Sequence, residues 1–187
     1  MEETPLETAL KEAQMGSRVA FGQVYEQFSR RVFGLCRKML GSRAAAEDAT
    51  SEVFERARRA LNQYDRDRPF DRWILTIASR HCLNHLRRER TEARLFGDEP
   101  LDVAADAASS SPLVACENRE QRRAVLRTID ALPENYRVPL VLRYYGDLSY
   151  DEIADHLGTT RNNVAVLLHR GKRELRRSIS ILRKEEP

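Results

Sequence analysis

The chain has 187 residues, of which 41% are hydrophobic and 33% are charged, and its formal net charge is +3. That length and apolar content suffice for one or two small compact domains. The three cysteines, Cys36, Cys82 and Cys116, are too widely spaced for a disulfide framework or a Cys-x-x-Cys metal motif. No apolar run approaches the roughly 20 residues that span a bilayer, and the acidic start MEETPLETALKEA is unlike a signal peptide. We therefore expect a reduced, cytoplasmic protein that does not insert into a membrane.

The charge is divided unevenly along the chain. Residues 1–90 carry 17 basic and 13 acidic groups, residues 91–120 carry 2 and 7, and residues 121–187 carry 13 and 9. Two basic segments thus flank an acidic one. The basic segments suit a polyanionic partner, and the acidic segment either occupies a basic channel or stays solvated.

Helical periodicity is common and strand signals are scarce, so we predict an all-α fold of two small helical domains joined by a flexible linker. The first domain covers residues 5–90. It opens with a short segment to about Gln14, followed by a helix over Ser17–Leu40 that Gly41 ends. A helix from Ser42 to about Asn62 follows, with Ala46, Ala49, Val53, Ala57 and Leu61 facing inward. After the loop YDRDRPFD, a helix from Arg72 to about Arg90 closes the domain.

This last helix carries the first candidate site. Its apolar residues Ile74, Ile77, Ala78 and Leu86 mark a buried side, and an outward stripe contains Arg80, Asn84, Arg87 and Arg88. Guanidinium groups interleaved with an amide suit a nucleic-acid backbone and one or two bases. Phe70 and Trp73 are candidate stacking surfaces nearby, although core packing explains Trp73 equally well. The alternative for the stripe is a solvated arginine face.

The preceding helix has the opposite charge. Asp48, Glu52 and Glu55 fall on one face, with Phe54 beside them. Such an acidic ridge suits a basic partner helix and not DNA. Its alternative is an ordinary solvated face.

Residues 91–116 are rich in Ala, Asp, Ser and Pro without an apolar period, which predicts a flexible linker. The second domain, residues 117–183, begins with a helix over Glu117–Ala131 and a further helix after Pro133.

The second domain ends in a helix-turn-helix pattern. Ser149 and Glu152 form a capping box, Gly158 supplies a left-handed turn residue, and Thr159 and Thr160 are N-cap candidates. Val164, Leu168, Gly171 and Leu175 mark the buried face of the last helix. The DNA-contact candidates on the other faces are Thr160, Arg161, Asn162, Asn163, His169, Arg170, Lys172 and Arg173, with Arg161 to Asn163 nearest the bases. A helical hairpin with a solvated basic face is the alternative.

Together these segments resemble a bacterial sigma factor of the extracytoplasmic-function type, the class of the sigma-70 family that retains only regions 2 and 4. FGQVYEQFSRRVFGLCRKMLG and AEDATSEVFERA resemble the helices that bind core RNA polymerase, and FDRWILTIASRHCLNHLRRER resembles the helix that recognises and melts the −10 element. The segment from LRTIDALPENY to LLHRGKREL resembles the −35-binding region.

The resemblance implies roles for individual residues. Asp48, Glu52, Val53, Phe54 and Glu55 would dock on the clamp helices of the largest polymerase subunit. Asn84 would lie beneath a pocket for a flipped −10 base, with the Arg66 to Phe70 loop as its wall. The acidic linker would thread toward the polymerase channels. The family is commonly held inactive by an anti-sigma factor, and it needs no catalytic residue, metal or cofactor, so we expect promoter DNA, core polymerase and an anti-sigma factor as partners.

The recognition helix departs from the family pattern. Where the family often has Gly-Thr-Val-Lys-Ser-Arg, this chain has Asn162-Asn163-Val164-Ala165-Val166-Leu167. The apolar residues Ala165, Val166 and Leu167 remove two cationic DNA contacts, and Leu167 can extend the buried face instead. We predict that Leu167→Arg strengthens promoter binding.

Two other functional classes compete with this interpretation. His81, Cys82 and His85 on one helix suggest a thiol or metal sensor, although a structural zinc site needs four ligands. A DNA-binding regulator that acts without polymerase explains the second domain but leaves the acidic ridge and the arginine stripe without a role. The sequence has no Gly-rich phosphate loop and no nucleophile elbow, so an enzyme is not expected.

Overall fold

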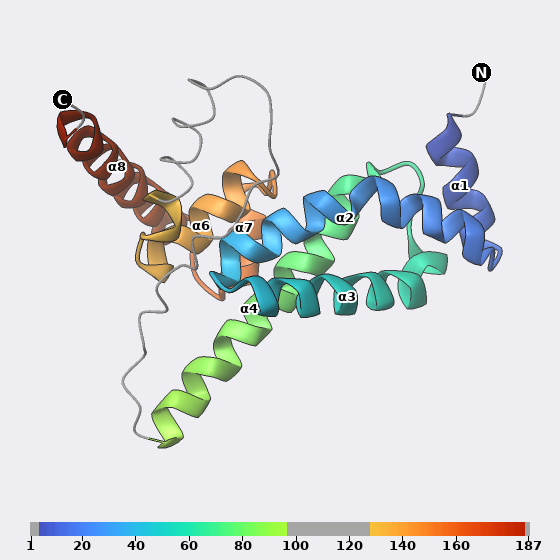
Figure 1. Ribbon diagram of the computed structural model, residues 1–187, viewed down its shortest axis with the longest axis horizontal. Coiled ribbons are helices and arrows are strands. Elements are labelled where there is room, and N and C mark those ends of the chain that lie inside the picture. Colours follow the sequence, from blue (N-terminus) through green and yellow to red (C-terminus); the bar gives the residue numbers. More distant parts are fainter. Residues whose placement is uncertain (1–3, 97–127, 186–187) are drawn as a thin grey trace.

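The computed structural model describes residues 4–96 and 128–185, and within these ranges every regular element is a helix (Figure 1). The all-α prediction is confirmed. The N-terminal lobe, residues 4–96, contains α1 (Pro5–Gln14), α2 (Arg18–Leu40), α3 (Arg43–Ala60), the 3-10 helix η1 (Leu61–Gln63) and α4 (Phe70–Phe96). The C-terminal lobe, residues 128–185, contains α6 (Glu134–Tyr144), α7 (Tyr150–Leu157) and α8 (Arg161–Glu185). Most of the predicted linker and residues 117–127 of the predicted helix over Glu117–Ala131 lie outside the described residues.

The start and end of α2 follow from local chemistry. The Ser17 hydroxyl accepts a hydrogen bond from the backbone N–H of Ala20, and Gly41 takes a left-handed conformation at φ 75° that ends the helix. These boundaries match the sequence prediction.

The predicted bounds of α4 are wrong at both ends. The helix begins at Phe70 instead of Arg72 and continues beyond Arg90 to Phe96. No glycine or proline interrupts the sequence between these points, and good helix formers predominate after Arg90, so the helix has no local reason to stop earlier. The lower half of α4 therefore projects from the body of the molecule (Figure 1).

The core of the N-terminal lobe lies where α2, α3 and α4 pack together. Leu35, Met39, Ile74 and Leu75 are among its largest fully buried side chains. The inward face predicted for the second helix is confirmed, because Ala46, Ala49, Val53, Ala57 and Leu61 are all buried. Three alanines on this face let α3 approach its neighbours closely.

The helix-turn-helix of the C-terminal lobe also forms as predicted. Ser149 and Glu152 make both hydrogen bonds of a capping box at the start of α7, and Gly158 ends that helix at φ 65°. Ile153, Val164 and Leu168 are buried where α7 packs on α8.

The two lobes are in contact with each other. Helix α2 lies against α6, and α4 lies against α7. In the described ranges, no helix has an apolar stretch long enough to cross a bilayer.

Candidate nucleic-acid interface

The arginine stripe predicted on the third long helix forms one exposed face of α4. Arg80, Asn84, Arg87 and Arg88 are all exposed. The opposite side of the helix is buried through Ile74, Ala78 and Leu86. Three guanidinium groups and one amide thus lie on the solvent-exposed side of α4, where a polyanion can reach them. The Arg87 guanidinium also donates a hydrogen bond to the His156 carbonyl oxygen of α7 at 2.9 Å, and a phosphate would have to replace that contact.

The aromatic residues at the start of α4 form a cluster in the core. The Phe70 side chain is only 4% exposed, and its ring centroid lies 5.0 Å from that of Phe28 and 5.2 Å from that of Tyr64. The prediction that Phe70 offers a stacking surface is therefore wrong for this structure, because its ring anchors α4 to α2. Trp73 is half-buried, with its ring 5.1 Å from Tyr64, and Arg66 is exposed in the loop before the helix.

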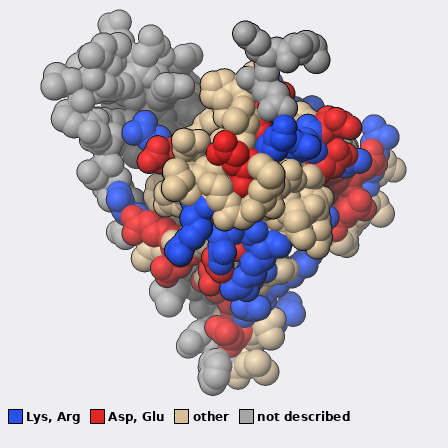
Figure 2. Space-filling view, turned by 90° about the vertical axis from the view of Figure 1, so that its right-hand side faces the viewer, with Lys and Arg blue, Asp and Glu red and all other residues tan. Residues whose placement is uncertain are grey.

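The acidic ridge on α3 is interleaved with arginines. Asp48 and Glu52 are exposed, but Glu55 accepts hydrogen bonds at 3.0 Å from both Arg58 and Arg59. These hydrogen bonds hold the pKa of Glu55 below its ordinary value. Basic and acidic side chains also lie close together on the molecular face shown in Figure 2. A basic partner on the ridge must therefore compete with the protein's own arginines.

The apolar residues predicted beside this ridge are not exposed. Val53 is fully buried and Phe54 is 4% exposed, with its ring 4.6 Å from that of Tyr25. The prediction of an exposed Phe54 contact is wrong, because α2 covers that side of α3. Tyr25 itself is 44% exposed, so it is the aromatic ring that a partner can reach there. Tyr25 is not among the partner contacts predicted from the sequence, and the hydroxyl on its ring is the signal that could have indicated an exposed aromatic residue.

The first turn of α8 presents the predicted base-reading residues. The Thr160 hydroxyl caps the helix by accepting from the Asn163 N–H, and the Asn163 amide donates to the Thr159 hydroxyl at 2.8 Å. Arg161, Asn162 and Asn163 are exposed. The partial positive charge of a helix N-terminus and an adjacent guanidinium favour anions such as phosphate. At Arg161 such an anion competes with the Asp151 carboxylate, which lies 3.9 Å from Arg161 Nε.

Further along α8, three of the predicted DNA-contact residues are exposed and one is half-buried. His169, Arg170 and Arg173 are exposed. Lys172 is half-buried, and its Nζ lies 5.5 Å from the centroid of the Tyr144 ring on α6. Lys172 is therefore engaged within the C-terminal lobe.

Comparison with known proteins shows which family each lobe matches. Residues 24–92 match the family Sigma-70 region 2, and residues 122–175 match Sigma-70 region 4. This chain belongs to the sigma-70 family. One relative is the ECF RNA polymerase sigma factor SigW of Bacillus subtilis, which is 27% identical, with 95% of this chain and 98% of SigW covered. Another is the ECF RNA polymerase sigma factor SigK of Mycobacterium ulcerans, which is 28% identical, with 91% of each chain covered. It is thus a family member of the extracytoplasmic-function type.

Two solved sigma factor structures share the fold. CnrH, in complex with the cytosolic domain of CnrY, superposes with a TM-score of 0.58 at 22% identity, covering 98% of this chain and 100% of CnrH. RpoE, in complex with the anti-sigma factor NepR from Bartonella quintana, gives 0.66 at 13% identity, covering 86% and 97%. In this sigma-70 family chain, α2 to α4 thus correspond to region 2 and α6 to α8 to region 4.

The metal-sensor alternative has no set of metal ligands in the part of region 2 that the structure describes. Cys82 is fully buried beside Cys36, and the hydrogen bond between the two thiols, together with burial, raises the pKa of Cys82. His85 Nδ1 lies 3.4 Å from Glu89. Among residues 4–96 and 128–185, no three His, Cys, Asp or Glu side chains converge as metal ligands would.

Proposed function

We propose that this chain is a sigma factor that directs core RNA polymerase to specific promoters in the cytoplasm. The observation that carries the proposal is the coexistence of two exposed surfaces that contain arginines, in segments that match regions 2 and 4: the α4 stripe, and the outer face of α8 with Arg161, Arg170 and Arg173. Each surface suits a different piece of one promoter.

In this proposal, α4 captures the melted −10 strand. Arg80, Arg87 and Arg88 contact phosphates, and the Asn84 amide hydrogen-bonds a flipped base. Arg66 and the exposed part of Trp73 lie at the edge of that pocket. Flipping a base costs a few kcal/mol, which stacking and amide hydrogen bonds can offset without nucleotide hydrolysis.

Helix α8 reads the −35 duplex in its major groove. Arg161, Asn162 and Asn163 reach base edges from the first turn, while His169, Arg170 and Arg173 contact the backbone. Phosphate contacts dominate the affinity, so binding weakens steeply with salt.

Helix α3 joins region 2 to the polymerase. Asp48, Glu52 and Glu55 supply a negative surface for the clamp helices of the largest subunit, with Tyr25 as the accessible aromatic neighbour. Binding replaces the ridge's own arginine pairs, which are exposed and individually weak.

The decisive experiment is run-off transcription with purified core enzyme on genomic fragments. We expect specific transcripts, and we expect the double charge reversal Asp48→Lys with Glu52→Lys to abolish co-purification with core. The matched control is Glu12→Lys with Glu92→Lys, which reverses two exposed acidic residues outside the ridge and outside both segments that resemble core-binding helices, and which should leave assembly intact. Absence of any transcript with active core, or an unchanged assembly after reversal at Asp48 and Glu52, contradicts the proposal. A regulator that acts without polymerase would bind DNA but fail to co-purify with core.

An anti-sigma factor is the remaining proposed partner. CnrH and RpoE, which share this fold, were both solved with a bound protein, and NepR is described as an anti-sigma factor. We expect the native chain, isolated from cells in which its promoters are silent, to carry an equimolar protein that blocks run-off transcription when added back. Isolation of the chain alone from such cells contradicts this partner.

A further inference from the structure

A valine lies in the middle of the polar outer face of α8. The Val166 side chain is 44% exposed, whereas Val164 and Leu168, two residues before and two residues after it, are 0% and 1% exposed. In a helix of about 3.6 residues per turn, these two buried positions place Val166 on the side opposite to the core. The core of the C-terminal lobe therefore does not require an apolar residue at position 166.

The residues one turn before and one turn after Val166 are polar and exposed. Asn162 is a proposed base contact, and Arg170 is a proposed backbone contact. Residues four apart share one face of a helix, and they are separated along its axis by about 6 Å, at about 1.5 Å per residue. Val166 therefore enters the same groove as Asn162 and Arg170 when α8 binds a duplex.

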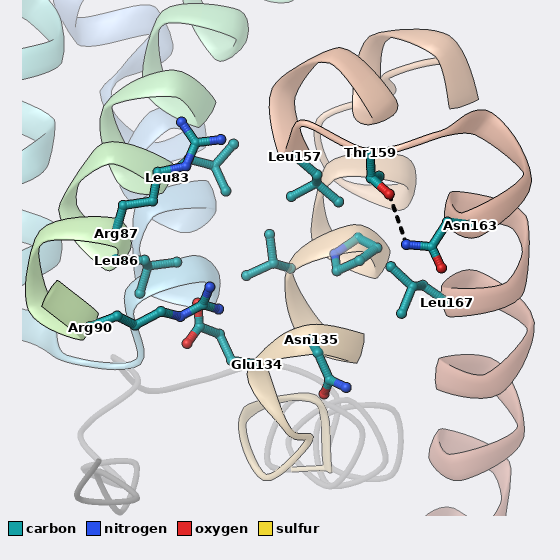
Figure 3. Close-up of a pocket in the computed structure, with 12 residues that line it drawn as sticks. Leu83, Leu86, Arg87, Arg90, Glu134, Asn135, Leu157, Thr159, Asn163 and Leu167 are labelled. Atoms are coloured by element: carbon teal, nitrogen blue, oxygen red, sulfur yellow. Dashed lines mark hydrogen bonds and ion pairs between the residues drawn. The ribbon is translucent and has the colours of Figure 1, made fainter. Parts of the chain in front are cut away.

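Two other proposed base contacts in the first turn already have partners within the lobe. The Asn163 amide donates to the Thr159 hydroxyl at 2.8 Å, as Figure 3 shows, and Arg161 Nε lies 3.9 Å from the Asp151 carboxylate. A base that binds either residue must compete with that internal contact. Val166 has no polar group in its side chain, so its contact with a base replaces no hydrogen bond of the protein.

Helix stability does not explain a valine at this position. Valine is one of the weaker helix formers, because its branched side chain has restricted freedom in a helix. Single exposed hydrophobic residues are common on protein surfaces, so exposure alone carries no inference. The observation that matters is the place of Val166 between two proposed DNA contacts.

The chemistry of the major groove indicates which base suits Val166. The C5 methyl of thymine is the one methyl group that the four bases present there, beside hydrogen-bond donors and acceptors. A valine placed against a donor or acceptor removes water from that group without replacing the lost hydrogen bond. Placed against the thymine methyl, its own two methyl groups gain apolar contact.

We propose that Val166 is a specificity-determining residue that recognises the C5 methyl of a thymine in the −35 element. This inference rests on the proposed function and specifies part of the sequence that α8 reads. The thymine lies within about two base pairs of the base that Asn162 contacts, because the 6 Å rise between the two residues is less than two base-pair steps of about 3.4 Å.

The test uses deoxyuridine, which lacks the C5 methyl of thymine and keeps its base pairing. Holoenzyme is assembled from this chain and core polymerase, and the DNA is a promoter fragment that is transcribed in the run-off experiment. Each thymine of the −35 region, on both strands, is replaced singly by deoxyuridine, and the dissociation constant is measured at fixed salt. We expect one replacement to weaken binding about fourfold, which is the effect of losing one buried methyl group.

Three variants test whether that effect depends on Val166. Val166→Ser removes both methyl groups of the side chain, so it should bind the thymine and deoxyuridine fragments equally. Val166→Ile keeps an apolar branched side chain and should retain the preference for thymine. Val19→Ser is the matched control, because it makes the same change at a position of α2 that is 78% exposed, and it should retain the fourfold preference. Circular dichroism confirms that each variant is folded.

The role of Val166 is overturned if no deoxyuridine replacement weakens binding by the wild type. Persistence of the preference in Val166→Ser, or its loss in Val166→Ile, also overturns it. Holoenzyme that transcribes the promoter and does not respond to the thymine methyl removes only the role of Val166 and leaves the proposed function intact. Absence of any transcript contradicts the proposed function itself, and the role of Val166 then fails with it.

Discussion

The two lobes position their proposed DNA contacts by different means. In the C-terminal lobe, neighbours in sequence fix the reading end of α8, because Gly158 ends α7 and the Thr160 hydroxyl caps α8. In the N-terminal lobe, the stripe on α4 is oriented by long-range packing, since Phe70 at its start is held by Phe28 of α2. Caps and turns thus position the reading end of region 4, whereas core packing orients the arginine stripe of region 2.

The largest expected effect comes from the core of the N-terminal lobe. Leu35 is fully buried in α2, so Leu35→Ala should lower the free energy of unfolding by about 2–5 kcal/mol through lost burial and a residual cavity. The matched control is Leu95→Ala in α4, where the side chain is 75% exposed and the change should stay within about 0.5 kcal/mol. Urea unfolding measures both. Equal losses of unfolding free energy in the two variants would mean that burial in the core does not determine the stability of this lobe.

The next prediction concerns the turn in the C-terminal lobe. Gly158 has φ 65°, so Gly158→Ala should cost about 1–2 kcal/mol of stability, because an L side chain is strained there. Gly22→Ala is the comparison. Gly22 is exposed inside α2, where alanine should stabilise by roughly 0.5–1 kcal/mol. Urea unfolding should therefore show that Gly158→Ala lowers the free energy of unfolding and that Gly22→Ala raises it. A change of the same sign at both positions would contradict the local explanation of the turn.

These two lobes also explain what the sequence could and could not predict. The capping box at Ser149 and the turn at Gly158 are signals contained within a few residues, and both were predicted correctly. The burial of Phe54 was missed because α3 is covered on more than one side, so its buried face is wider than one helical period indicates. The Arg87 contact with His156 joins residues far apart in the chain, and no periodic pattern contains that information.

A smaller effect is expected where the lobes meet. Leu167 is half-buried and, together with Leu83 and Leu86 of α4, lines a cavity of about 200 Å³ between the two lobes (Figure 3). Leu167→Arg should tighten binding to a −35 duplex by about 1 kcal/mol and steepen the slope of log K against log salt by about 0.9, which corresponds to one new phosphate contact.

The control for this charge is Val19→Arg, because Val19 is 78% exposed at the start of α2. Salt titrations of DNA binding by both variants distinguish a phosphate contact made at position 167 from a general effect of added positive charge. An equal gain in both variants, or a weaker affinity for Leu167→Arg, would remove Leu167 from the DNA-facing surface.

The smallest effect is a pH dependence of the capping boxes. Hydrogen bonds from the Ser149 backbone N–H and hydroxyl hold the pKa of Glu152 below its ordinary 4.5, so the folded state gains stability above that pH and loses it as the pH falls through the lowered value. Glu152→Gln keeps the reciprocal hydrogen bond without a titrating group. The stability difference between wild type and variant should be constant from pH 7 to about 5.5 and shrink toward pH 3, by less than about 1 kcal/mol because the carboxylate is half exposed.

The N-terminal lobe has a matched capping box at Thr4 and Glu7, where the Thr4 backbone N–H lowers the pKa of Glu7 in the same direction. Urea unfolding of Glu7→Gln across the same pH range should therefore show a change of the same sign. The capping boxes of the two lobes would then contribute to stability in the same way. The difference between the lobes would lie in the core packing that orients α4. A pH dependence confined to Glu152 would instead make capping itself a distinguishing property of region 4.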